Sequence, residues 1–175
     1  MKREDGTRNV EWTPFHAIGH DIKVAIDNGA PMGAVILTYA AIDAMAFLSM
    51  PEIKKEVTRE DYIGWTEKYL KADQGQPYQY VGIDVYGARC GLFHRYSGTS
   101  NLSDKGRCRV FAYHDGSEHI YRPRISDKLV LISMRRFVND FFGAMKTFLS
   151  EAITDRDLRS KMSKRMGDIL HVSSV

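Results

Sequence analysis

The sequence predicts a mainly α-helical, up-and-down bundle with a small β-hairpin inserted before the penultimate helix. Most apolar residues recur every three or four positions, as in helices that bury one face. Residues from about 105 to 133 instead hold two β-prone runs around Asp115-Gly116, a dipeptide typical of tight hairpins. With 175 residues the chain is long enough to form one domain with its own core. We expect a single helical domain over residues 14–175, preceded by a flexible polar arm over residues 1–13.

The first helix is predicted from the residues at its two ends. Thr13 is a good N-cap, Pro14 suits the first helical position, and Gly29 marks the stop. Between these signals, Ile22 and Ile26 fall on one side of the segment. This pattern indicates an amphipathic helix with one buried face.

The second helix is predicted from an apolar run bounded by two prolines. The run extends from Met32 to Met50, between Pro31 and Pro51. It is nearly long enough to span a bilayer, but it carries Asp43 and lacks basic flanks close by. A helix that is apolar nearly all round suits the centre of a bundle. The start of the chain also lacks a secretory signal, and we therefore expect a cytoplasmic protein without a membrane partner.

Later segments complete the predicted bundle. Thr58 and Asp61 have the spacing of a helix cap, and a further helix is expected over about residues 80–96, between a turn-rich linker (72–79) and a loop (97–107). The apolar run "KLVLIS", a strand or helix start, leads into a long amphipathic helix, and a basic helix ends the chain. The buried stripe of the long helix is predicted to contain Phe137, Phe141, Met145 and Phe148.

Composition limits the classes of function. A net charge of +3 tolerates a polyanionic partner without requiring one. Cys90 and Cys108 are not spaced as a disulfide framework or as a metal-ligand pair. His16 and His20 lie one helical turn apart, but no third ligand accompanies them. We expect neither a metal site nor a cofactor.

Asp43 needs a partner if the second helix lies in the core. A carboxylate inside an apolar helix is costly unless it is paired. The nearest plausible cation from another core helix is Arg89. The sequence leaves open whether this pair is structural or supports a functional site.

The helix over about 80–96 carries a motif. The segment "RCGLFHRY" places Arg89, His94 and Tyr96 in the pattern R-x4-H-x-Y. R-x4-H recurs at Arg109 and His114, so the tyrosine and the helical context supply the specificity. The motif resembles the signature of the HEPN family, small helical bundles of which many are metal-independent ribonucleases or toxins of toxin–antitoxin pairs. The resemblance extends over about residues 14–152, with two long helices before the motif.

This resemblance implies a reaction and a role for each residue. His94 would act as general base or acid, since an imidazole exchanges protons near neutral pH. Arg89 would hold the scissile phosphate. Asp43 is not part of the motif, and we expect it to be a supporting residue because it is the predicted partner of Arg89. Attack by the 2′-oxygen would leave a 2′,3′-cyclic phosphate without a metal. Tyr96 would hydrogen-bond a phosphate or base, and toxin-type members can be neutralised by modification of the matching tyrosine.

The resemblance also implies partners. The motif of the family faces its copy in a homodimer and forms a composite cleft there, and toxin-type members have an antitoxin partner. RNA is the implied substrate. The basic residues expected to contact phosphates without sequence preference are Arg95, Arg107, Arg156, Arg159 and Lys164.

A non-catalytic alternative remains open. In that case the chain is a HEPN-like module that binds RNA, a nucleotide or a protein partner. An enzyme should expose Arg89 and His94 together in a positive cleft at a two-fold interface. A binding or structural module should bury Arg89 against Asp43 and leave His94 isolated.

Overall fold

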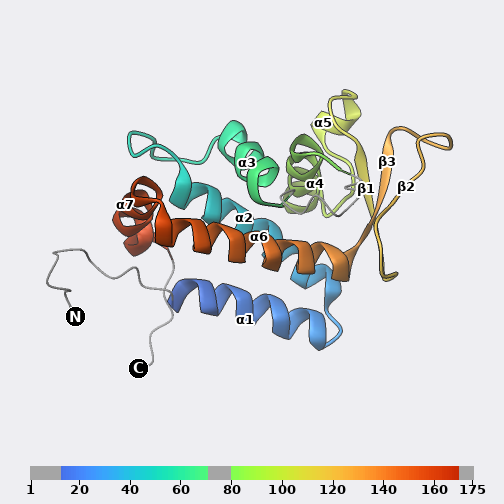
Figure 1. Cartoon of the computed structure of the whole chain (residues 1–175). Coiled ribbons are helices and arrows are strands. Elements are labelled where there is room, and N and C mark those ends of the chain that lie inside the picture. The colour runs from blue at the N-terminus through green and yellow to red at the C-terminus, as the bar shows by residue number, and fades with distance from the viewer. Residues whose placement is uncertain (1–12, 71–79, 170–175) are drawn as a thin grey trace, which may run out of the picture.

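The predicted mainly helical fold with a small β insertion is confirmed by the computed structural model, which describes residues 13–70 and 80–169 (Figure 1). The predicted linker at 72–79, and the predicted arm apart from Thr13, lie outside the described residues. The helices are α1 (Thr13–Asp27), α2 (Pro31–Ser49), α3 (Arg59–Trp65), α4 (Gly82–Arg95), α5 (Asn101–Asp104), α6 (Met134–Thr154) and α7 (Arg156–Arg165), with a π-helical turn η1 (Thr66–Leu70) and a 3-10 turn η2 (Met166–Asp168). The strands are β1 (Val110–His114), β2 (Ile120–Tyr121) and β3 (Leu129–Ser133).

Helix α2 forms the centre of the bundle, as its all-round apolarity predicts. It packs against α1, α3, α4, α6 and α7, and Figure 1 shows α1 and α6 lying alongside it. Ile42, Met45 and Leu48 of α2 are completely buried. By length and composition α2 could also cross a membrane, but half of its most apolar stretch is buried inside the fold. The helix therefore has the environment of a core helix in a globular domain.

The helix ends follow the local signals. Thr58 Oγ1 accepts a hydrogen bond from the backbone N–H of Asp61, and an Asp61 carboxylate oxygen accepts one from the N–H of Thr58 at 3.0 Å. This capping box is the arrangement that the spacing of the two residues predicts. On α6, Phe137, Phe141 and Phe148 are fully buried, whereas Met145 is half-buried.

The predicted hairpin at Asp115-Gly116 is wrong, although the β insertion itself is present. The strand order is β1-β3-β2, so β1 and β2 do not pair across that turn. Instead β3 pairs in parallel with β1 and antiparallel with β2. Val130 and Ile132 of β3 are completely buried, and a strand with such residues gains most at the centre of a sheet. This long-range gain outweighs the local turn signal.

A buried polar cluster holds the sheet on the bundle. The backbone N–H of Ser133 donates to Nδ1 of His119 at 3.1 Å, so Nε2 carries the proton and donates to Asp140 of α6 at 3.1 Å. The same carboxylate accepts from the Tyr80 hydroxyl at 3.2 Å and from Arg136 at 3.0 Å. The cluster thus joins the sheet, α6 and the segment before α4.

Gly91 allows the chain after α4 to fold back onto the helix. A Cβ at this position would lie 2.5 Å from the carbonyl oxygen of Thr99 and 2.6 Å from that of Ser97. Because both are backbone atoms, Gly91→Ala is expected to lower the free energy of unfolding by about 2–3 kcal/mol. Urea denaturation followed by circular dichroism measures this change.

Gly143→Ala in α6 is the matched control for Gly91→Ala. A Cβ at Gly143 meets no atom within 4 Å. The control should raise stability by about 0.5–1 kcal/mol, since alanine favours a helix interior. Equal stability of the two variants would contradict the close packing at Gly91.

Candidate functional site

The Arg89 guanidinium lies against Asp43 of α2. Its Nε and Nη2 atoms are each 2.7 Å from the same Asp43 carboxylate oxygen. About a quarter of each side chain remains exposed, 25% for Arg89 and 27% for Asp43. The guanidinium also lies 5.5 Å from the ring centre of Phe93, one turn further along α4. The predicted Asp43–Arg89 pair is present, but it is not completely buried in the core.

Partial burial changes the pKa of the Asp43 carboxyl. Desolvation raises the pKa of this carboxyl above its ordinary value of 3.8, although the hydrogen bond and charge of Arg89 lower it. When folding raises the pKa of a carboxyl, that carboxyl stabilises the fold, and its full contribution is present at pH values below the pKa of the unfolded state. That contribution is lost as the pH rises through the folded pKa.

The pH dependence of stability should therefore differ between the wild type and Asp43→Asn. Relative to the variant, the wild type is expected to lose stability as the pH rises from below 3.8 through the raised pKa, and then to level off. Urea denaturation over a pH series measures the difference. A wild type that gains stability relative to the variant over this range would mean that the Arg89 contact dominates desolvation.

His94, Arg95 and Tyr96 lie at the C-terminal end of α4, and all three side chains are exposed. The His94 side chain makes no hydrogen bond or ion pair within the described part of the chain. Arg95 donates to Asp104 at 3.0 Å and also contacts Asn101, both in α5. This end of α4 is thus held next to α5 while the imidazole stays accessible.

Tyr96 has an unusual backbone conformation. Its φ angle is +49°, and among the described residues it is the only non-glycine residue with positive φ. A bulky residue in this left-handed region costs about 1–2 kcal/mol. Tyr96 is 69% exposed, so burial of its ring does not offset the strain. Such strain is often retained where a side chain has a functional task.

The structure does not bring Arg89 and His94 together within one chain. Five helical residues correspond to a rotation of about 140° around the axis. Arg89 faces α2 through Asp43, whereas His94 is exposed at the helix end. The geometry of one chain therefore fits the outcome expected of a binding or structural module, except that Arg89 is not buried.

A groove of about 580 Å³ adjoins the Asp43–Arg89 pair. Its walls come mainly from α1 and α2 and include the apolar side chains Leu37 and Phe47. Besides Asp43, the carboxylates of Asp21 and Asp168 line it, so the groove is not a positive cleft. Its surface is better suited to an apolar contact than to RNA.

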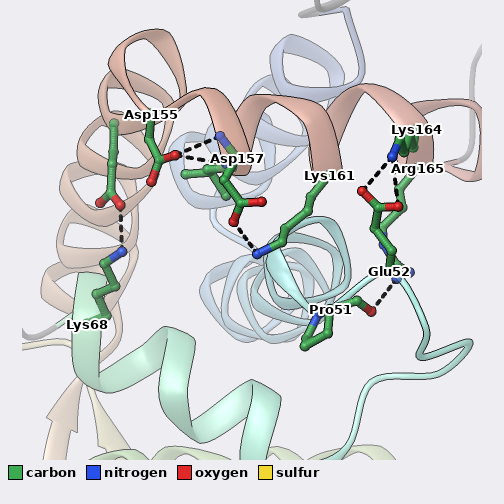
Figure 2. A network of polar contacts seen from close by, with 10 residues as sticks. Pro51, Glu52, Lys68, Asp155, Asp157, Lys161, Lys164 and Arg165 are labelled. Carbon is green, nitrogen blue, oxygen red and sulfur yellow. Dashed lines mark hydrogen bonds and ion pairs between the residues drawn. The ribbon is translucent and has the colours of Figure 1, made fainter.

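The five basic residues predicted to contact RNA do not form one surface. Arg95 and Arg107 lie around α5, whereas the other three lie on α7, at the opposite end of the bundle in Figure 1. Lys164 Nζ lies 2.7 Å from a carboxylate oxygen of Glu52, and this pair is drawn in Figure 2. Arg159 donates to the carbonyl of Ile153 at 2.7 Å. Only Arg107 and Arg156 of this set are exposed without a side-chain partner among the described residues.

The cations of the β2–β3 loop are not among the site residues predicted from the sequence. Arg122, Arg124 and Lys128 are exposed and make no ion pair with a described residue. The short "RPRISDK" segment is a basic signal, but its position relative to α4 depends on the strand pairing. With a hairpin predicted at Asp115-Gly116, the sequence did not indicate that this basic segment lies at the same end of the sheet as the start of β1.

Comparisons with known proteins add nothing to this geometry. No family model matches the chain, and neither the curated proteins nor the solved structures include a significant match.

Proposed function

We propose that this chain is a HEPN-like, metal-independent endoribonuclease of the cytoplasm that acts as a homodimer. The observation that carries the proposal is the end of α4, where His94 is exposed without a partner in the described residues and is followed by the strained, exposed Tyr96. The left-handed conformation itself closes the helix, since the N–H of Tyr96 donates to the carbonyl of Leu92 at 3.0 Å and that of Ser97 to the carbonyl of Gly91 at 3.2 Å. Such a helix end requires neither an exposed imidazole nor an exposed tyrosine at this position. Glycine rather than tyrosine is the usual residue in such a left-handed position.

The proposed reaction needs two groups and no redox step. His94 takes the proton from a ribose 2′-hydroxyl, and the 2′-oxygen forms a bond to the adjacent phosphorus. The bond from phosphorus to the 5′-oxygen of the next nucleotide breaks. That oxygen takes a proton from water as it leaves, and the proton held by His94 returns to the solvent. Arg89 stabilises the negative charge that builds on the phosphate oxygens. The products are a 2′,3′-cyclic phosphate and a 5′-hydroxyl.

The divergence of Arg89 and His94 makes a second copy part of the proposal. In the HEPN resemblance the motif faces its copy, so His94 of one chain would work with the guanidinium of the other. Exposed apolar side chains beside the motif supply a contact surface, with Phe93 46% exposed on α4 and Leu37 38% exposed on α2. Asp43 then acts as a positioning residue that holds Arg89.

The second candidate is a HEPN-like module that binds RNA, a nucleotide or a protein partner without cleaving RNA. The Asp43–Arg89 pair favours it, because a neutralised guanidinium holds phosphate less strongly. The groove next to the pair gives such a module an apolar surface for a protein partner. A toxin-type role, with an antitoxin that modifies Tyr96 or covers the α4 end, belongs to the first candidate.

Incubation of the purified protein with single-stranded RNA in the presence of a chelator tests the proposal. Cleavage that leaves cyclic-phosphate ends, together with a dimer in light scattering, is the expected result. RNA that is bound but stays intact would reject the enzyme and support the second candidate. Arg89→Lys should lower the cleavage rate, because an ammonium cannot replace the planar fork of a guanidinium on phosphate.

A further inference from the structure

The sheet gathers the ends of three strands at one edge. Because β1 and β3 are parallel, with Val110 opposite Leu129, both strands begin at the same end of the sheet. β2 is antiparallel to β3, with Tyr121 opposite Val130, so it finishes at that end. In Figure 1 this end, with the loop between β2 and β3, lies on the same side of the molecule as α5.

These segments bring exposed cations to one place. Lys105 and Arg107 precede β1, and Arg122, Arg124 and Lys128 lie between β2 and β3. All five are exposed, and none has an ion pair or side-chain hydrogen bond with a residue that the structure describes. Of the acidic residues in the same segments, Asp104 is already paired with Arg95, which leaves Asp127. We call these five cations the basic end of the sheet.

The basic end is continuous with the end of α4 that carries His94. Arg95 of α4 pairs with Asp104, the residue directly before Lys105. Gly98, two residues after Tyr96, packs against the carbonyl of Phe111 in β1, and a Cβ there would lie 2.2 Å from that oxygen. The backbone of Lys128 also accepts a hydrogen bond from Val110 at 2.8 Å. A single-stranded RNA that passes His94 can therefore continue over the basic end.

We propose that the basic end binds the sugar–phosphate backbone of single-stranded RNA beside the cleavage site. This inference rests on the proposed function and names the surface that holds its substrate. Unpaired guanidinium and ammonium groups bind phosphates without reading sequence. Tyr96, at the border of this surface, adds an exposed ring on which a base can stack.

The shape of the surface favours RNA over an anionic membrane. Its cations are spread over separate loops rather than along one face of an amphipathic helix. A hollow of about 240 Å³ lies beside Arg122 and is lined by Ile120, Ile125 and Leu129 among others. Such a hollow can take the flat face of a base next to a bound phosphate.

The test uses the full chain and a fluorescein-labelled oligouridine whose 2′-hydroxyls are methylated, so that it binds but cannot be cleaved. The triple variant R122A/R124A/K128A is compared with K55A/R135A/K146A, which removes three exposed cations from other parts of the molecule. By fluorescence anisotropy, the first variant is expected to raise Kd by about tenfold or more. The slope of log K against log salt should fall by about 2, since each contact to a single strand contributes about 0.7. The control variant should stay close to wild type.

A second variant tests whether the separate segments act as one surface. The variant K105A/R107A removes two cations from the segment before β1, and it is also expected to weaken RNA binding. Unchanged affinity for this variant, or equal losses for the triple variant and its control, would overturn the proposal. A triple variant that loses only its binding to phosphatidylserine vesicles and keeps its RNA affinity would also overturn it, in favour of a membrane surface.

The same experiment separates this inference from the proposed reaction. If unmethylated RNA stays intact with the wild type while binding still depends on the basic end, the enzyme proposal fails and the RNA surface stands. Circular dichroism of each variant verifies that the fold is retained.

Discussion

His94→Ala is expected to reduce RNA cleavage by about 100-fold to 10 000-fold, the range typical of losing a general acid or base. In the proposed reaction no other side chain at the end of α4 can replace His94 as proton acceptor, because residues 92–96 contain no carboxylate and no second imidazole. The rate of cyclic-phosphate formation on a labelled RNA measures the loss.

The fold should be unaffected by His94→Ala, since the side chain is exposed and has no partner in the described part of the chain. A Tm within about 2 °C of wild type is expected for such a surface change. His20→Ala, which removes another exposed histidine from α1, is the matched control and should retain full activity. Cleavage by the His94 variant at the wild-type rate would eliminate His94 as a proton-transfer group.

Asp84→Ala is expected to have the largest effect on stability, a loss of about 3–5 kcal/mol. The Asp84 side chain is 2% exposed. It accepts hydrogen bonds from the backbone N–H of Val81 at 3.0 Å and of Arg109 at 2.7 Å. The Arg109 guanidinium donates to the same carboxylate, with Nε at 2.9 Å. The alanine variant leaves the guanidinium and two backbone donors without this acceptor.

Asp104→Ala is the control for Asp84→Ala, because it removes a carboxylate from an ion pair whose two side chains are about half exposed. A loss below about 1 kcal/mol is expected for an exposed pair. Urea denaturation of both variants gives the comparison. Similar losses for the two variants would show that the α4–β1 connection does not depend on Asp84.

Local sequence determined most of the helical framework. Thr58 and Asp61 form the predicted capping box, and Pro31 and Pro51 bound α2. Asp43 lies within an apolar run of the sequence. This was enough to predict a cation as its partner, because an unpaired carboxylate is too costly there. These features depend on residues that are neighbours along the chain or on the cost of burying one group. The sequence can therefore specify them without knowledge of distant contacts.

Tertiary structure decided how the sheet pairs and which charges remain available. The Asp115-Gly116 signal is local, but β3 gains more by burying Val130 and Ile132 between β1 and β2. That pairing brings Arg107 close to the β2–β3 loop, whereas folding against α2 pairs Lys164 with Glu52. Whether a cation is neutralised or stays available depends on residues far away in the chain. Spacing along the sequence predicts helices well for this protein, whereas its charged surface follows from long-range packing.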